Sequence, residues 1–233
     1  TKKTYFGFKG LAISTVLLDN VGLYIENYSG TPFSDEDNKI LMRFGKVFQQ
    51  SYTRFLDLQK AEAQAREAEI QLSLERVRAR SMAMQSSDEL HEVIGTVFQQ
   101  FDKLGIQPVN VFLSLFDREK RRLTYRASGK SGQRRPAKQE VDIDSVEAWS
   151  DLYNKWINDS SDDIEVIFYP KEIVPHIFNL LKETFQAMPK ADRMTVKDFP
   201  EGGFSTLGYT PFGYLGYDHT RKPTEEEKDI LQR

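Results

Sequence analysis

The sequence predicts an α+β protein in three successive parts: an N-terminal β-hairpin, one long helix with a coiled-coil-like pattern, and a domain with an antiparallel sheet and flanking helices. Three observations support this prediction. β-favourable residues lie on both sides of a turn signal at Asp19-Asn20. Between Ser34 and Ser86 there is no proline and only one glycine. Helical and strand patterns then alternate from residue 87 to residue 222.

Composition narrows the class of protein. The chain has 233 residues, a formal net charge of -3 and no cysteine. Without cysteine there can be no disulfides, thiolate metal sites, cysteine nucleophiles or thioether-linked chromophores. The charge predicts no nucleic-acid partner, and no apolar run approaches the roughly 18 residues of a membrane helix. We therefore expect a cytoplasmic chain without membrane contact.

Two segments about 190 residues apart share one pattern. Each has a proline, a Ser or Thr at an N-cap position, acidic residues in the first turn and an Ile-Leu pair, at 32–41 and 223–231. Thr224 with Glu227 fits the capping box, and Ser34 with Asp37 is a weaker version of it. The repeat predicts two copies of one junction, where a sheet domain is followed by a long helix.

This repeat divides the chain into four segments. We predict that 1–33 is the C-terminal hairpin of a preceding unit, 34–86 a linker and dimerisation helix, 87–222 a sheet domain, and 223–233 the start of the next linker helix. Two strands between residues 4 and 28 form the hairpin. Because a lone hairpin is only marginally stable in water, it requires a partner, either a missing domain or a second copy of the chain.

The long helix carries an interrupted apolar seam. Its apolar residues recur at spacings of 3, 4 and 7 and are Leu41, Phe44, Phe48, Phe55, Leu58, Ala65 and Leu72. Glu62 and Glu69 interrupt the pattern. About 50 helical residues form a rod of roughly 75 Å, too long for a small domain to cover. We therefore expect a homodimer through residues 34–84; the alternative is a solvated, charged helix that packs on its own domain.

The sheet domain is predicted element by element. We expect helices at 90–104, 146–157 and 173–188, strands at 109–116, 121–128, 164–169, 194–197, 204–210 and 212–219, and a basic loop at 129–138. Within 109–116, alternation places Asn110, Phe112, Ser114 and Phe116 on one strand face and Val109, Val111, Leu113 and Leu115 on the other.

Two stretches of the long helix resemble linkers between GAF-type units in multidomain bacterial sensor histidine kinases. They read FGKVFQQSYTRFLDLQKAEAQAREA (44–68) and LERVRARSMAM (74–84). The element order of 87–222 resembles the GAF domain, a ligand-sensing relative of the PAS fold. The resemblance implies a non-enzymatic sensory fragment of a two-component signalling protein. It would bind a small molecule and relay its state through a dimeric helix to an output kinase domain outside this chain.

The resemblance also implies a ligand pocket between the sheet and the intervening helices. The residues that would line it are Phe112, Ser114, Phe116, Tyr125, Trp149, Tyr153, Trp156, Tyr209, Phe212 and Tyr214. Aromatic walls with a few polar groups suit a small organic ligand. The alternative is an ordinary aromatic core without a cavity, in a ligand-free GAF-like module that serves dimerisation and spacing.

Other chemistry has little support in the sequence. His91, His176 and His219 fall on separate predicted elements without metal-ligand spacing, so we expect no metal and no cofactor. The stretch 89–92 is similar to a kinase phospho-acceptor box, but a sheet domain follows it, and we expect a surface histidine. No phosphate loop or nucleophile elbow indicates a catalytic site. If Arg121, Arg122, Arg134, Arg135 and Lys138 form one basic patch, an anionic partner remains an alternative.

Overall fold

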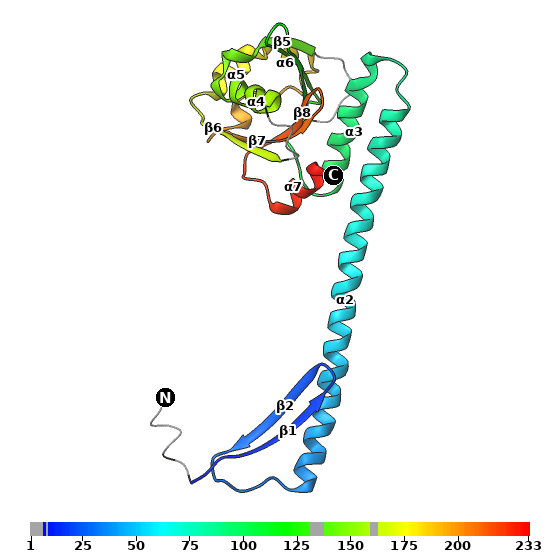
Figure 1. The fold of residues 1–233 in the computed structure, drawn as a ribbon, viewed down its shortest axis with the longest axis vertical. Helices are drawn as coiled ribbons and strands as arrows, with labels where there is room; N and C mark the ends of the chain where they lie inside the picture. The colour runs from blue at the N-terminus through cyan, green and yellow to red at the C-terminus, as the bar shows by residue number, and fades with distance from the viewer. Residues whose placement is uncertain (1–6, 8, 131–137, 159–162) are drawn as a thin grey trace. The chain divides into compact units, whose positions relative to one another are not determined.

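The structure is a computed structural model that describes residue 7 and residues 9–130, 138–158 and 163–233. It is a mixed α+β protein with a long helix, a two-stranded sheet and a six-stranded antiparallel sheet (Figure 1). The chain divides into two compact units, Thr1–Ala68 and Glu69–Arg233. The boundary falls inside the long helix, so each unit contains one part of that helix.

The first unit begins with an antiparallel hairpin. Its strands are β1 (Ala12–Leu18) and β2 (Val21–Asn27), with Leu18 opposite Val21 across the turn. The long helix α2 (Asp35–Met82) follows. Ser34 and Asp37 form a reciprocal cap, since the Asp37 carboxylate accepts from Ser34 N at 2.9 Å and the Ser34 hydroxyl accepts from Asp37 N at 3.2 Å. The predicted helix start is therefore confirmed.

The hairpin packs on α2 of the same chain. Its inward face includes Val16, and a Cβ built on Gly45 would lie only 2.8 Å from a Val16 methyl carbon, so the missing side chain permits this approach. Gln49 also donates to the Asp19 carboxylate at 3.1 Å. The prediction that the partner must be another domain or a second chain was wrong for this face. The outward face, which includes Leu17 at 80% exposure, has no such cover within the described first unit.

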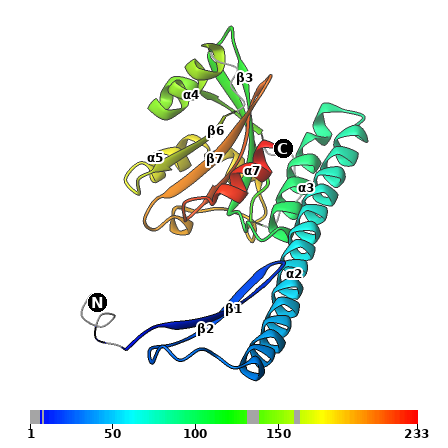
Figure 2. The same ribbon diagram turned by 60° about the horizontal axis from the view of Figure 1, so that its bottom comes forward.

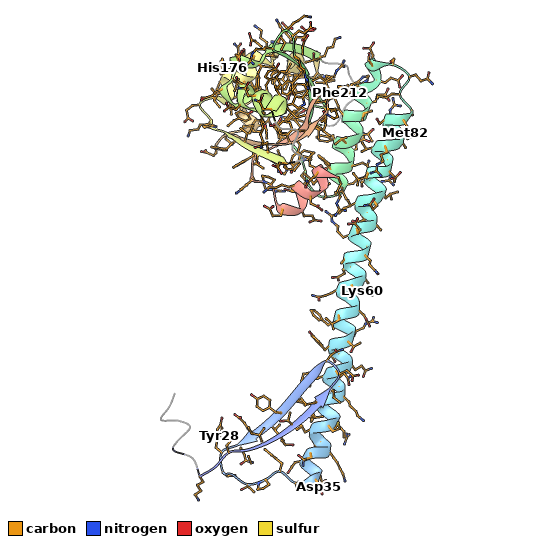
Figure 3. All side chains as sticks on the ribbon, viewed as in Figure 1. Tyr28, Asp35, Lys60, Met82, His176 and Phe212 are labelled. Carbon is orange, nitrogen blue, oxygen red and sulfur yellow. The ribbon has the colours of Figure 1, made fainter. Side chains whose placement is uncertain are left out.

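The seam of α2 is mostly exposed in the first unit. Leu41 is buried under the hairpin, but Phe44, Phe48, Phe55 and Leu58 are each about half exposed or more. All residues from 51 to 65 are exposed, and their side chains stand off the helix around Lys60 (Figure 3). The helix is thus longer than the surface that the described hairpin covers.

The second unit is built on a six-stranded antiparallel sheet. The strands are β3 (Asn110–Asp117), β4 (Arg122–Ala127), β5 (Lys138–Asp142), β6 (Ile164–Tyr169), β7 (Gly203–Thr210) and β8 (Gly213–His219). Their spatial order is β5-β4-β3-β8-β7-β6. The central pair, β3 and β8, joins segments about 100 residues apart, with Asn110 opposite Asp218 and Leu115 opposite Gly213.

Helices lie on both faces of this sheet. The helices are α3 (Leu90–Lys103), α4 (Glu147–Asn158), α5 (Val174–Leu180), α6 (Lys182–Ala187) and α7 (Glu225–Gln232), with short 3-10 turns at Ser87–Glu89, Ile143–Ser145 and Val196–Asp198. The core on one face is formed with α4, α5 and α6, and the core on the other with α3, α7 and the last turns of α2. Figures 1 and 2 show α4 and α5 on the opposite side of the sheet from α3 and α7.

Ion pairs and a hydrogen bond join the final turns of α2 to α3. Arg80 contacts the Glu89 and Glu92 carboxylates at 3.0 and 2.5 Å, and Arg76 donates to the Gln100 amide oxygen at 3.2 Å. A short 3-10 turn, Ser87–Glu89, separates these two helices, next to the boundary expected between segments 34–86 and 87–222. The linking helix and the first helix of the sheet domain therefore form one antiparallel pair in the second unit.

Several sequence predictions were wrong in detail. The strand expected at 194–197 is a turn, because Thr195 and Asp198 cap each other, with Thr195 N donating to the Asp198 carboxylate at 2.7 Å. The helix expected at 173–188 divides at Leu181. There Gln139 of β5, a strand that the sequence analysis missed, accepts from Glu183 N at 3.1 Å and donates to Leu180 O at 2.5 Å.

The predicted basic patch is described only in part. Arg134 and Arg135, with most of the predicted basic loop, lie outside the described residues. Arg121 pairs with Asp144 at 2.6 Å, and Arg122 lies 3.7 Å from the Glu140 carboxylate. Both described arginines therefore have acidic partners.

Candidate functional site

A cavity of about 70 Å³ lies in the second unit between the sheet and helices α4, α5 and α6. Residues of five strands, β3, β4, β6, β7 and β8, form its floor. Residues of the three helices and of the segment around Met194 and Phe199 form its roof. The lining residues are Phe112, Leu123, Tyr125, Trp149, Tyr169, Val174, Ile177, Phe178, Leu181, Phe185, Met194, Phe199, Gly203, Phe204, Ser205, Leu207, Tyr214 and Asp218.

Aromatic rings form most of the cavity wall. Phe112 stacks on Tyr125 with ring centroids 5.7 Å apart and meets the Tyr214 ring edge-on at 6.1 Å. On the helical side, Phe185 lies 6.4 Å from Tyr125. Gly216 makes room for this arrangement, because a Cβ at that position would lie 2.7 Å from the Phe112 ring. The wall is thus a packed set of rings with defined orientations.

Four polar side chains are linked by hydrogen bonds here: Tyr125, Ser205 and Asp218 line the cavity, and Asn110 does not. The Asn110 amide, which is fully buried, donates to the Tyr125 hydroxyl and to the Asp218 carboxylate, both at 3.0 Å. Ser205 donates to the other Asp218 oxygen at 2.5 Å. The Asn110 oxygen in turn accepts from Gly129 N at 3.2 Å. Strands β3, β4, β7 and β8 therefore hold the Asp218 carboxyl in one orientation.

Burial controls the protonation of these groups. Burial raises the pKa of Asp218 from its ordinary 3.8 to about 6, although the Ser205 and Asn110 donors favour the charged form. Burial also raises the pKa of Tyr214 to about 12, with a further contribution from Asp218 and a partial offset from the Ser114 hydroxyl. The pKa values of Tyr125 and Tyr169 rise as well, in both cases mainly through burial. Near neutral pH the tyrosines are thus neutral and Asp218 is mostly ionised.

The structure brings four of the ten predicted site residues into the cavity wall. These are Phe112, Tyr125, Trp149 and Tyr214. Ser114 is fully buried on the same face of β3 but does not line the cavity. It lies opposite Tyr214 in the pairing of β3 with β8. The predicted strand alternation therefore placed this part of the site on the correct face of β3.

Four further predicted residues lie outside the cavity wall: Phe116, Tyr153 and Trp156 form a second aromatic cluster, and Tyr209 contacts α4 beside it. Phe116 lies 5.1 Å from Tyr153 and 4.9 Å from Trp156, measured between ring centroids. Trp156 donates to Thr210 O at 2.9 Å, and Tyr209 donates to Leu152 O at 3.4 Å. These contacts satisfy the polar tips of the rings, so the cluster is packed core.

Phe212, the tenth predicted residue, lies at the turn between β7 and β8. Its side chain is 71% exposed and does not line the cavity. The position of Phe212 is visible in Figure 3, where it is labelled. The sequence predicts a strand at 212–219 that includes Phe212, but β8 begins one residue later.

Sequence reasoning missed the polar part of the site. Asn110, Ser205 and Asp218 were not proposed, nor was Tyr169 of β6. A signal existed for Asn110, since it shares a strand face with Phe112 and a buried amide requires partners. Its partner Asp218 is 108 residues away, and no local pattern predicts that pairing.

The opposite face of β8 meets the helices. Tyr217 is fully buried there, with its ring 5.4 Å from the Phe101 ring of α3. His219 contacts Ile106 O through Nε2 at 2.6 Å, and burial lowers its pKa. Asp218, between these two residues, faces the cavity. Adjacent residues of one strand thus contact the cavity and the helical layer.

The described residues form neither a metal-binding cluster nor a membrane-spanning helix. No group of three His, Asp or Glu side chains there is placed to hold a metal ion. His91 contacts the Asp88 carbonyl and His176 the Ser145 carbonyl, so each described histidine has a backbone partner. None of the helices in this part of the chain has the length and apolar character needed to cross a membrane.

The comparison of the chain with protein-family models and with curated proteins gives no match. The functional assignment therefore depends on the cavity, its polar floor and its connection to the helices.

Proposed function

We propose that this chain is a sensory relay segment of a bacterial two-component signalling protein. Its second unit is a GAF-like domain that binds a small molecule in the cavity beside Asp218. The chain acts as a homodimer through α2 and passes the state of the cavity toward an output kinase domain outside this chain. No catalytic step is assigned to it.

One observation carries the proposal: the cavity lies between the sheet and its intervening helices and shares strand β8 with the helical layer. Tyr214 and Asp218 face the cavity, whereas Tyr217 packs against α3. Because alternate residues of a strand point to opposite faces, a shift of β8 at the cavity also moves groups among the helices. The cavity position is the one that the GAF resemblance implies.

The helical layer supplies a route to other domains. Its core joins Ile70 of α2, Phe101 of α3 and Ile230 of α7 with Tyr217 of the sheet. The helix that enters the second unit and the helix that follows its last strand therefore share one core. A ligand that prefers one of two arrangements of this core would bias both helices, which is the requirement for relay.

The homodimer is supported by the exposed seam of α2. Phe48 and Phe55 are seven residues apart, on one face of the helix, and each is about half exposed. Exposed apolar side chains in such a row are stabilised when a second copy covers them. The repeated junction supports the modular arrangement, since in both units an antiparallel hairpin leads into a helix with a capping box.

The second candidate is a ligand-free GAF-like module that serves dimerisation and spacing. The small volume of the cavity favours it, because ligand pockets usually enclose roughly 300–1,000 Å³ and this cavity encloses about 70 Å³. Under the first proposal, the ligand is compact enough to fit this small volume. The two candidates therefore differ in whether the cavity is occupied.

Native mass spectrometry of the purified chain tests the proposal. We expect the mass of a dimer that carries one small molecule on each chain. Collisional heating should release that molecule and leave the bare polypeptide mass. A dimer with only the polypeptide mass would favour the spacer module, and a monomer at tens of micromolar would exclude relay through a helix pair.

A further inference from the structure

We propose that the cavity binds a compact organic cation, an ammonium compound with few heavy atoms, with Asp218 as its counter-ion and the aromatic rings as its wall. This inference rests on the proposed function, because it takes the cavity to be a ligand site, and it names the chemical class of the ligand.

Asp218 is the one charged residue among the described residues that line the cavity. The list of lining residues contains no Lys, Arg or His. The two Asp218 oxygens accept from Ser205 and from Asn110, which are both neutral donors. These bonds orient the carboxylate but do not cancel its charge. A buried carboxylate without a cation is costly, and a cationic ligand would remove that cost.

The carboxylate is already held in position before any ligand binds. The Asn110 amide that donates to it is itself fixed, because its oxygen accepts from Gly129 N at 3.2 Å and its nitrogen also bonds to Tyr125. Asp218 is desolvated by the surrounding residues but keeps some exposed surface, and it is part of the cavity wall. A ligand therefore meets a carboxylate that needs little reorganisation.

The wall suits a positive charge better than a negative one. The faces of Phe, Tyr and Trp rings attract cations, and Phe112, Tyr125, Trp149 and Tyr214 all line the cavity. The raised pKa values of Tyr125 and Tyr214 keep both hydroxyls neutral at physiological pH. An anionic ligand would face Asp218 with no described basic residue to balance the two charges. The cavity volume of about 70 Å³ limits the cation to a compact one.

Binding should depend on pH through Asp218. The titratable groups that share the cavity with it are Tyr125, Tyr169 and Tyr214, whose pKa values are all raised above the ordinary 10.0. Of these cavity groups, only Asp218, with a pKa of about 6, changes charge between mildly acidic and neutral pH. Protons and a cation compete for the same carboxylate, so acid should weaken binding.

The test is isothermal titration of the full chain with methylammonium, tetramethylammonium and choline chlorides, and with tert-butanol as an uncharged match for tetramethylammonium. The variant is Asp218→Asn, and the control is Asp151→Asn, which makes the same charge change at an exposed position on α4. Circular dichroism and the melting temperature establish that each variant is folded.

We expect saturable binding of at least one of the three cations, at least about 10-fold tighter than that of tert-butanol, since 1.4 kcal/mol of charge interaction is a factor of ten. Asp218→Asn should weaken it by the same factor, and Asp151→Asn should leave it unchanged. If Asp218→Asn does not fold, the pH dependence of cation binding by the wild-type chain provides the test. The Kd of the cation should rise about 10-fold from about pH 7.5 to about pH 5, where the Asp218 carboxylate is largely protonated.

Failure of this inference is distinguishable from failure of the proposed function. Equal binding of tert-butanol and the cations, or an unchanged Kd in Asp218→Asn or at acidic pH, overturns the cation assignment and leaves a ligand cavity. The absence of saturable binding for all three cations also overturns it. In that case a small molecule found by native mass spectrometry would still support the proposed function, with a ligand of another class.

Discussion

The Asn110 side-chain amide donates a 3.0 Å hydrogen bond to the Asp218 carboxylate, and these two residues are opposite each other where β3 pairs with β8. The first strand of the sheet domain and its last are therefore joined by side chains as well as by backbone. Asp218 lines the cavity, and Asn110 orients its carboxylate.

Replacement of Asn110 by alanine should destabilise the second unit by about 2–4 kcal/mol, because it leaves buried partners without hydrogen bonds. The groups that lose a partner are the Tyr125 hydroxyl, the Asp218 carboxylate and Gly129 N. Urea denaturation followed by tryptophan fluorescence measures the loss. The control is Asn158→Ala at the exposed end of α4, where we expect less than about 0.5 kcal/mol; equal losses in both variants would contradict the role of Asn110.

Asp218 should make the stability of the fold depend on pH. Its folded pKa of about 6 lies above the ordinary 3.8, so the folded state keeps its proton where the unfolded state loses it. The contribution of this group to the free energy of unfolding therefore falls by about 3 kcal/mol between about pH 4 and about pH 6. Above about pH 6 it stays at the lower value.

Asp218→Asn removes this dependence. The stability of the variant minus that of wild type should rise by about 3 kcal/mol between acidic and neutral pH. Asp151→Asn, which removes the same charge at an exposed position on α4, is the control. Denaturant midpoints measured across this range provide the comparison. A difference that does not change with pH would show that the Asp218 pKa is not raised by the fold.

The start of α7 depends on the pair formed by Arg221 and Glu227. The buried Glu227 carboxylate accepts from Arg221 at 2.5 and 3.0 Å and from Thr224 N at 2.8 Å. Burial would raise the pKa of Glu227, but these hydrogen bonds outweigh it and the pKa is lowered. Arg221→Ala should therefore cost about 2 kcal/mol at neutral pH, because it leaves a buried carboxylate without its cation.

The cost of Arg221→Ala should shrink in acid. A carboxyl with a lowered folded pKa stabilises above its ordinary pKa of 4.5 and loses that contribution as pH falls through the folded value. Lys171→Ala, which breaks an exposed pair with Glu201 at 3.9 Å, should have almost no effect at either pH. A cost for Arg221→Ala that is the same at both pH values would rule out the ion pair as its cause.

The exposed seam should control the oligomeric state. Phe48→Glu with Phe55→Glu places two charges in the seam, and we expect the dimer to separate at tens of micromolar, as measured by light scattering. The matched variant Gln59→Glu, also on an exposed position of α2, should remain dimeric. Helix content by circular dichroism should be preserved in both. A wild-type monomer, or a seam variant that stays dimeric, would remove α2 from the dimer interface.

Local patterns predicted most of the elements of this fold. The hairpin turn at Asp19-Asn20, the long helix from Ser34 and the two faces of β3 follow from turn residues, capping and alternation, which act over a few neighbours. The prediction failed at β5, which has the short sequence KQEVD, and at 194–197, where the Thr195 and Asp198 cap replaced a strand. Short segments carry too little pattern to decide between such states.

The candidate site was predicted only in its aromatic part. Phe112, Tyr125, Trp149 and Tyr214 were identified because large rings on a core face are visible in the sequence. Asp218 was missed because its importance comes from pairing with Asn110 and from burial, which no local pattern encodes. Phe116 of β3 and Trp156 of α4 have the same ring chemistry but fall into the second cluster, because tertiary packing, and not a local pattern, decides which rings meet at the cavity.

Thermal denaturation of the chain with a library of small metabolites shows whether the cavity of the second unit binds a small molecule. A ligand at 100 times its Kd stabilises the fold by about 2.7 kcal/mol, or roughly 5–10 °C in melting temperature for a unit of this size. Leu207→Trp fills the cavity, and Phe212→Trp enlarges an exposed ring at the turn after β7. We predict at least one compound that stabilises wild type and Phe212→Trp but leaves a folded Leu207→Trp unchanged. If no compound stabilises wild type, or if the shift is the same in Leu207→Trp, the cavity is not a ligand site.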